Sequence, residues 1–127
     1  MPKSYAGSVH EFDRAIVAHL QWRIRLNEAF GTGSSPVSVE SASDETLCDF
    51  GKWITGPMIP DQVRSTDLFQ SVCRIHCYFH KSAAVILDQA LKQGDADTIV
   101  LKASLREYDR SSNDLLETLL KWREEEL

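Results

Sequence analysis

Cys48-Asp49-Phe50-Gly51-Lys52-Trp53 stands about midway along the chain between His19 and the pair His76 and His80. One cysteine and three histidines form a donor set that suits zinc, which takes four ligands in a tetrahedron and favours thiolate sulfur and imidazole nitrogen. The stretches of chain on either side of the cysteine block are of nearly equal length. If the four side chains meet, the segments that carry them must lie side by side, and this requirement constrains the fold.

Apolar side chains recur at helical spacing in four segments of the chain, whereas the alternating patterns typical of strands are sparse. Glycine and proline mark breaks between these segments, as at Gly31 and at Gly56-Pro57. Ser8 followed by Glu11 forms a capping box that predicts where the first helix begins. The predicted helices cover residues 9–30, 45–55, 65–93 and, starting at Asp95 or Asp97, a last segment to about residue 125.

These helices predict an all-α fold: an antiparallel helical bundle of three long helices plus one short helix that carries Cys48. The short link at Gly94 predicts that the last two helices are antiparallel neighbours. Residues 31–42 are rich in Gly, Ser and Pro, so we expect a loop there, with a short unpaired strand conceivable at 37–39. The sequence shows no repeat, and we expect a single domain over residues 1–127.

His76 and His80 are four residues apart, so a helix places them one above the other on one face, where they can bind one ion together. His19 falls near the middle of the first predicted helix and faces inward with Phe12 and Ile16. Each candidate also has an ordinary explanation, because a buried histidine is commonly a hydrogen-bonded core residue and a free cysteine packs as a small hydrophobe. Spacing alone leaves the choice between a metal site and simple packing open.

Cys48 is expected in the first turn of the short helix or just past it, where amide groups and the helix dipole lower the pKa of a thiol. Gly51 interrupts the same helix, at a cost of about 1 kcal/mol relative to alanine. We therefore expect Gly51 to let another helix approach the metal closely.

The formal charge of −5, the pI of about 5.3 and the lack of a basic stripe argue against binding to nucleic acid or to a membrane surface. Residues 1–5 carry no apolar run and no segment reaches the length of a membrane span, so we expect neither a signal peptide nor a transmembrane helix. Three cysteines are an odd number that favours a reducing compartment, and we expect a cytoplasmic protein.

Cys73 and Cys77 lie on the third predicted helix, each three residues before a histidine. Because Cys77 is rotated by about 100° from His76, it cannot readily replace that histidine in one tetrahedron. A disulfide between residues four apart on an unbroken helix is geometrically poor. We expect Cys73 and Cys77 to be packing residues. The other interpretations are that they are alternative metal ligands or a reserve of redox-active thiols near the site.

The chain resembles the chemoreceptor zinc-binding (CZB) domain family. That family has a histidine followed three residues on by an aromatic residue or leucine, then a cysteine–x–hydrophobe–glycine–x–hydrophobe block, then two histidines four apart. This sequence supplies His19 with Trp22, the block from Cys48 to Trp53, and His76 with His80. Every element of the pattern is present and in order.

The resemblance implies that His19, Cys48, His76 and His80 are zinc ligands in a cytoplasmic, bacterial sensory module. It covers about residues 10–85 by motif, and the whole chain by size and helical layout. Members are usually attached to chemoreceptor signalling domains or to diguanylate cyclases, and they report zinc or oxidants such as hypochlorous acid. No signalling domain follows the bundle in this sequence, so we expect a free-standing member or a segment of a longer protein.

We expect no enzymatic activity, because four protein ligands leave no open position for water and no Glu lies between His76 and His80. A di-iron bundle would need inward carboxylates in Glu-x-x-His arrangements, which the predicted core positions do not supply. The remaining alternative is a metal-free or structurally zinc-stabilised helical module for protein interaction or dimerisation.

The last helix leads us to expect a homodimer, which the family resemblance also suggests. Its apolar stripe exceeds what a minimal bundle needs to bury. The stripe includes Tyr108, Leu115, Leu119 and Trp122.

Overall fold

The computed structural model of the chain describes residues 9–92 and 99–126, and these residues form six helices and no strand. The long helices are α1 (Val9–Thr32), α5 (Asp67–Leu91) and α6 (Ile99–Glu126). The short helices are α2 (Val39–Ser43), α3 (Asp49–Thr55) and α4 (Asp61–Arg64). The predicted all-α bundle with three long helices is confirmed.

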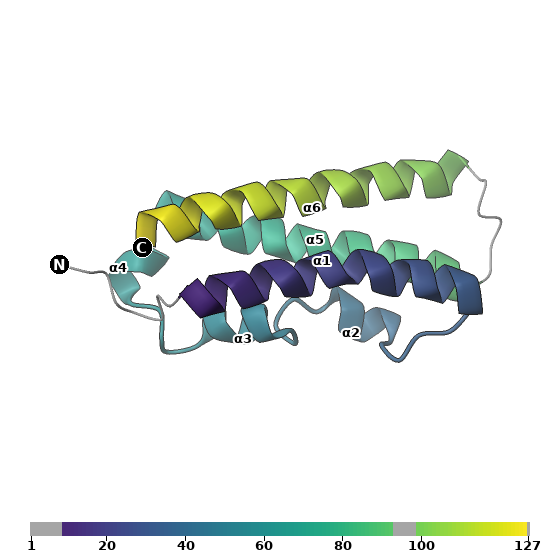
Figure 1. Cartoon of the computed structure of the whole chain (residues 1–127), viewed down its shortest axis with the longest axis horizontal. Coiled ribbons are helices and arrows are strands. Elements are labelled where there is room, and N and C mark those ends of the chain that lie inside the picture. The colour runs from purple at the N-terminus through teal and green to yellow at the C-terminus, as the bar shows by residue number, and fades with distance from the viewer. Residues whose placement is uncertain (1–8, 93–98, 127) are drawn as a thin grey trace.

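Helix α6 runs antiparallel to both α1 and α5 (Figure 1). Arg123 near its end pairs with Asp13 near the start of α1 at 3.6 Å, and Asp109 pairs with Arg23 at 3.5 Å. Helices α1 and α5 run in the same direction, and the chain returns between them through α2 and α3 (Figure 1). The bundle therefore alternates up and down, with its second helix broken into two short pieces.

Helix α2 falls almost entirely within the segment where we expected a loop, so the prediction for residues 39–42 was wrong. Ser38 caps this helix, because its Oγ accepts a hydrogen bond from the amide of Ser41 at 3.1 Å. Its one buried side chain, Ala42, is 1% exposed. A five-residue helix with a single buried residue has no apolar period, and this is why the sequence pattern missed it. Residues 37–39 do not form a strand.

The other helix boundaries differ from the predicted ones by a few residues. Helix α3 begins at Asp49 rather than at residue 45, because Cys48 is its N-cap and the residues before it form a turn. Helix α5 begins at Asp67, where the Thr66 Oγ accepts a hydrogen bond from the Phe69 amide at 3.2 Å. The caps expected at Ser8 and from Gly94 to Asp97 lie outside the described residues.

The core between the long helices takes up the apolar stripe of α6. Tyr108, Leu115, Leu119 and Trp122 are each at most 1% exposed. The reason we gave for a homodimer was therefore wrong, since this surface is buried within the chain itself, and the homodimer stays a prediction. Within the described ranges, no helix combines the length and the hydropathy that a membrane crossing requires.

Candidate metal centre

Helix α5 carries two of the four predicted donors on its buried face. His76 and His80 are 0% and 1% exposed, and their Nε2 atoms lie 3.0 Å apart. The Nδ1 of His80 lies 3.1 Å from the carbonyl oxygen of Ala42. A carbonyl oxygen only accepts, so this Nδ1 must carry the proton, and the Nε2 of His80 presents a lone pair to the site.

Helix α1 supplies the third imidazole from the opposite wall. His19 is 2% exposed, and its Nδ1 donates a hydrogen bond to the carbonyl oxygen of Ala15 at 2.6 Å. Its Nε2 is buried and has no hydrogen-bond partner among the described residues. Burying a nitrogen without a hydrogen bond lowers the stability of the fold. This nitrogen lies among the other histidines, where a bound ion would satisfy it.

Cys48 is the N-cap of α3, and its Sγ accepts a hydrogen bond from the amide of Gly51 at 3.2 Å. The same Sγ lies 3.3 Å from the Nε2 of His76. Unlike the three histidines, Cys48 is partly exposed. The thiol is therefore both a local helix cap and the donor nearest to solvent.

Gly51 allows a close approach, but the partner is not the one we expected. A Cβ at this position would collide with the backbone carbonyl oxygen of Glu45 and lie 3.0 Å from the Cα of Thr46. The close neighbour is thus the turn that leads into α3, rather than another helix. Glycine lets that turn fold back so that the Gly51 amide reaches the Cys48 sulfur.

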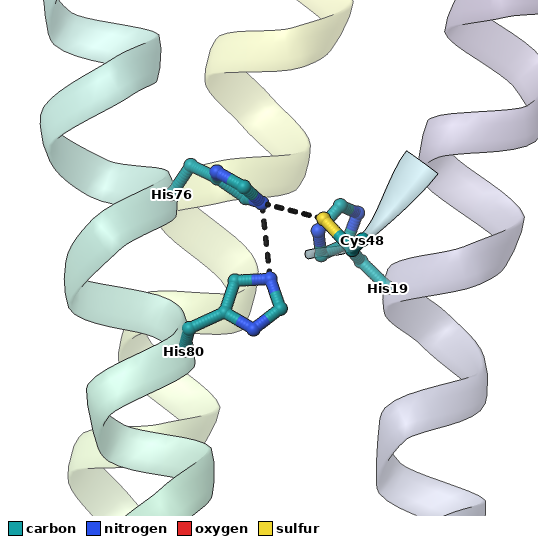
Figure 2. Close-up of side chains that lie close together, drawn as sticks. All are labelled: His19, Cys48, His76 and His80. Carbon is teal, nitrogen blue, oxygen red and sulfur yellow. Dashed lines mark hydrogen bonds between the residues drawn. The ribbon is translucent and has the colours of Figure 1, made fainter. Parts of the chain in front are cut away.

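The structure brings all four predicted residues together, with one donor atom of each within 4.8 Å of the others (Figure 2). In a tetrahedral zinc site the donor atoms stand about 3.3–3.7 Å apart, as follows from the usual bond lengths. The separations of 3.0 Å and 3.3 Å around His76 are close to that range. The donor chemistry and the unpaired Nε2 of His19 both fit a zinc ion held at this point.

Sequence reasoning missed the groups that orient the imidazoles. His19 and His80 each give their second nitrogen to a backbone carbonyl, at Ala15 and at Ala42. Such outer contacts fix the tautomer and the ring direction of metal ligands. The Ala15 contact follows from helical spacing, whereas the Ala42 contact depends on α2, which the sequence pattern did not reveal.

Burial keeps the imidazoles neutral. It lowers the pKa of His19 to about 4, against a backbone hydrogen bond that raises it, and it lowers the pKa of His76 to about 2 together with repulsion from His80. Burial also lowers the pKa of His80. Neutral imidazole is the form that binds a metal, so the fold prepares these three rings for that task.

The expected direction for Cys48 was wrong. Hydrogen bonds from the first turn of α3 act to lower the pKa of the thiol, but burial outweighs them and the pKa is raised. The error arose because the helix end is visible in the sequence, whereas burial depends on how the bundle packs. A cation at this point would favour the thiolate.

Cys73 and Cys77 are not among the clustered donors in the part of the chain that the structure describes. Cys73 packs against the core, as we expected. Cys77 lies beside Glu45, and burial together with that carboxylate raises the pKa of its thiol. Neither residue shares the position of a ligand.

Comparison with known proteins agrees with this geometry. No curated protein and no solved structure matches the chain. The sequence profile of the chemoreceptor zinc-binding domain matches residues 19–87, which is more than half of the chain. The matched segment begins at His19, the first of the four clustered residues, and includes the other three. The chain therefore belongs to the chemoreceptor zinc-binding domain family.

Proposed function

We propose that His19, Cys48, His76 and His80 hold one zinc ion in a regulatory module of bacterial signalling, of the chemotaxis or cyclic-di-GMP type. The observation that carries this proposal is the convergence of four donor atoms within 4.8 Å while the His19 Nε2 is buried and unpaired. Bound zinc supplies a dication that satisfies imidazole lone pairs and stabilises a thiolate. Zinc or an oxidant is the proposed stimulus, and the cytoplasm the proposed compartment.

The signal would arise at Cys48. This donor is partly exposed and caps a seven-residue helix, whereas the three histidines lie on long helices. Oxidation of the sulfur toward the sulfenic and sulfinic acids, or withdrawal of the metal, would remove the anchor at the start of α3. Helix α3 would then move before the rest of the bundle and pass the change to a partner or an attached signalling domain.

Metal analysis of protein purified without a histidine tag tests the proposal. We expect about one zinc per chain, and a loss of zinc affinity of more than 100-fold in Cys48→Ala and in His76→Ala, since even outer contacts of a metal site are worth about 10- to 100-fold. A Cys48→Ala variant that binds zinc as tightly as the wild type would contradict it.

The alternative is a helical interaction module that lacks metal or holds zinc only as a structural element. Protein that contains no zinc would favour the metal-free form. Zinc that stays bound after oxidant treatment, measured against a chelator of known affinity, would favour the structural form. The buried, unpaired Nε2 of His19 supports a bound ion over simple packing.

Catalysis is not part of the proposal. Four protein donors fill a tetrahedral zinc ion and leave no position for a reactive water. The residues between His76 and His80 are Cys77, Tyr78 and Phe79, so the helix lacks the glutamate base of zinc proteases.

We also propose a homodimer, formed through the outer face of α1. Val17, Leu20 and Ile24 are between 50% and 58% exposed and follow one another at helical spacing. A second copy presents the same stripe, and antiparallel pairing of two α1 helices would oppose Arg14 of one copy to Glu28 of the other.

Light scattering should show a dimer for the wild type and for Met58→Glu, but a monomer for Leu20→Glu. A wild-type monomer at high micromolar concentration would refute the dimer.

A further inference from the structure

The position of α3 decides whether Cys48 reaches the three imidazoles. A helix of seven residues is too short to be stable by itself, so its place is set by its attachments. The ion pair between Asp49 and Arg14, at 3.6 Å, joins side chains that are 81% and 65% exposed, and such pairs contribute little. The edge-to-face contacts of Trp53 with Phe12 and of Phe50 with His76 bury one face of the helix, but they leave its last carbonyl groups without partners.

Arg64 holds the opposite end of α3 with directional bonds. Its Nη1 donates to the carbonyl oxygen of Ile54 at 2.9 Å, its Nε donates to that of Ile59 at 3.2 Å, and its Nη2 donates to that of Gly56. The guanidinium carbon lies 5.9 Å from the centre of the Phe69 ring. One side chain from α4 thus fixes the last turn of α3, the loop after it and the start of α5.

The chemistry of this contact is specific to arginine. The last carbonyl groups of a helix have no partner within the helix and carry a partial negative charge, so a cation there is favourable. Three carbonyl oxygens are engaged by three nitrogens of a flat, rigid group. A lysine offers one flexible nitrogen and cannot reproduce this arrangement.

We propose that Arg64 is a positioning residue for the metal centre, which fixes the angle of α3 so that the Cys48 sulfur meets the imidazoles. Ile54 is six positions after Cys48, so the sulfur-bearing end lies about 9 Å along the helix from the Arg64 contact. A tilt of about 10° about that contact moves the other end by about 1.5 Å, whereas metal–ligand distances tolerate about 0.2 Å. This inference rests on the proposed zinc site.

Cobalt(II) substitution of the full chain, purified without a tag, tests the inference. A thiolate ligand gives a sulfur-to-cobalt charge-transfer band in the near ultraviolet, whereas the visible bands report tetrahedral coordination. We expect Arg64→Lys and Arg64→Ala to lose most of the charge-transfer band relative to the visible bands. We also expect them to bind zinc about 10- to 100-fold more weakly than the wild type. Arg74→Ala removes an exposed arginine from α5, and it should match the wild type in its charge-transfer band and in its zinc affinity.

Each outcome separates the inference from the function on which it rests. A wild type without the charge-transfer band would overturn the proposed zinc site itself. A wild type with the band, and Arg64 variants with the same band and the same zinc affinity, would overturn only the role of Arg64, even if their melting temperature fell. If Arg64→Ala does not fold, Arg64→Lys decides between these outcomes.

Discussion

The four donors of the centre come from two regions that are built in different ways. The three imidazoles lie on α1 and α5, which are 24 and 25 residues long and are packed against α6. The thiol belongs to Cys48, the N-cap of α3, which has seven residues and follows a turn. The long helices hold three neutral rings in a fixed frame, whereas the short segment brings the fourth donor to them. Under the proposed sensory function, this division would let the short segment respond to the metal while the long helices keep their shape.

The largest effect on stability and zinc affinity should come from adding a side chain at Gly51, where the turn before α3 packs against the helix. Gly51→Ala places a Cβ against the backbone of Glu45, which cannot move aside as a side chain tip would. We expect a loss of about 3 kcal/mol in stability and a loss of more than 100-fold in zinc affinity. Thermal unfolding and chelator competition measure the two.

Gly31→Ala is the matched control, because a Cβ there meets nothing within 4 Å and the residue lies in the last turn of α1. It should leave zinc affinity unchanged and stabilise the chain by up to about 1 kcal/mol. If the two substitutions changed stability and zinc affinity equally, the packing of the turn before α3 against Gly51 would have no special role.

Low pH should destabilise the region formed by the long helices, which carry the histidines. Burial lowers the pKa of His19 to about 4 and that of His76 to about 2, so between those values and about 6.5 the unfolded chain binds protons that the folded chain does not. The stability of the metal-free protein is therefore complete above pH 6.5 and falls as the pH drops below it. At pH 5.5 the two residues together should cost about 3 kcal/mol.

Denaturant unfolding of metal-free protein between pH 7.5 and 5 measures this slope. His76→Leu removes the group with the lower pKa. It should reduce the slope of the unfolding free energy against pH by the equivalent of about one proton. A stability that does not change between pH 7.5 and 5 would show that the imidazoles are not buried as described.

Metal removal should act on the short-helix region. Hydrogen exchange of the amides in α3, including that of Gly51, which bonds to the Cys48 sulfur, should become at least tenfold faster without zinc. Amides in the buried centre of α5, near Phe79 and Ala83, should change by less than about threefold. An equal change in both regions would mean that the bundle responds as one unit.

The sequence was sufficient for the long helices and for the choice of the four residues that cluster in the core. Apolar periods revealed α1, α5 and α6, and the donor types singled out His19, Cys48, His76 and His80 before any contact was known. These features are local, since a helix period and a residue type can be recognised without knowing what lies across the core.

The features that the sequence did not reveal depend on groups far apart in the chain. The carbonyl of Ala42 orients His80 across 38 residues, and a backbone carbonyl has no signature in the sequence. The pKa of Cys48 rises because burial outweighs the helix-end hydrogen bonds, and burial is a property of the packed bundle. The sequence predicted a close approach at Gly51 but named the wrong neighbour, because the turn before α3 was predicted to be part of the helix.

The smallest effect should come from the exposed ion pair of α3. Arg14→Ala removes contacts at 3.6 Å to Asp49 and Glu11, whose side chains are 81% and 33% exposed. We expect a change of less than about 0.5 kcal/mol in stability and less than twofold in zinc affinity. A large loss of affinity would show that this pair, rather than the buried contacts, holds α3 in place.

X-ray absorption at the zinc edge tests the central claim most directly, because it counts the donor atoms around the ion. We predict three nitrogen donors at about 2.0–2.1 Å and one sulfur at about 2.3 Å, with the sulfur lost in Cys48→Ala. A wild-type spectrum without sulfur, or with two sulfur donors, would contradict a centre made of His19, Cys48, His76 and His80.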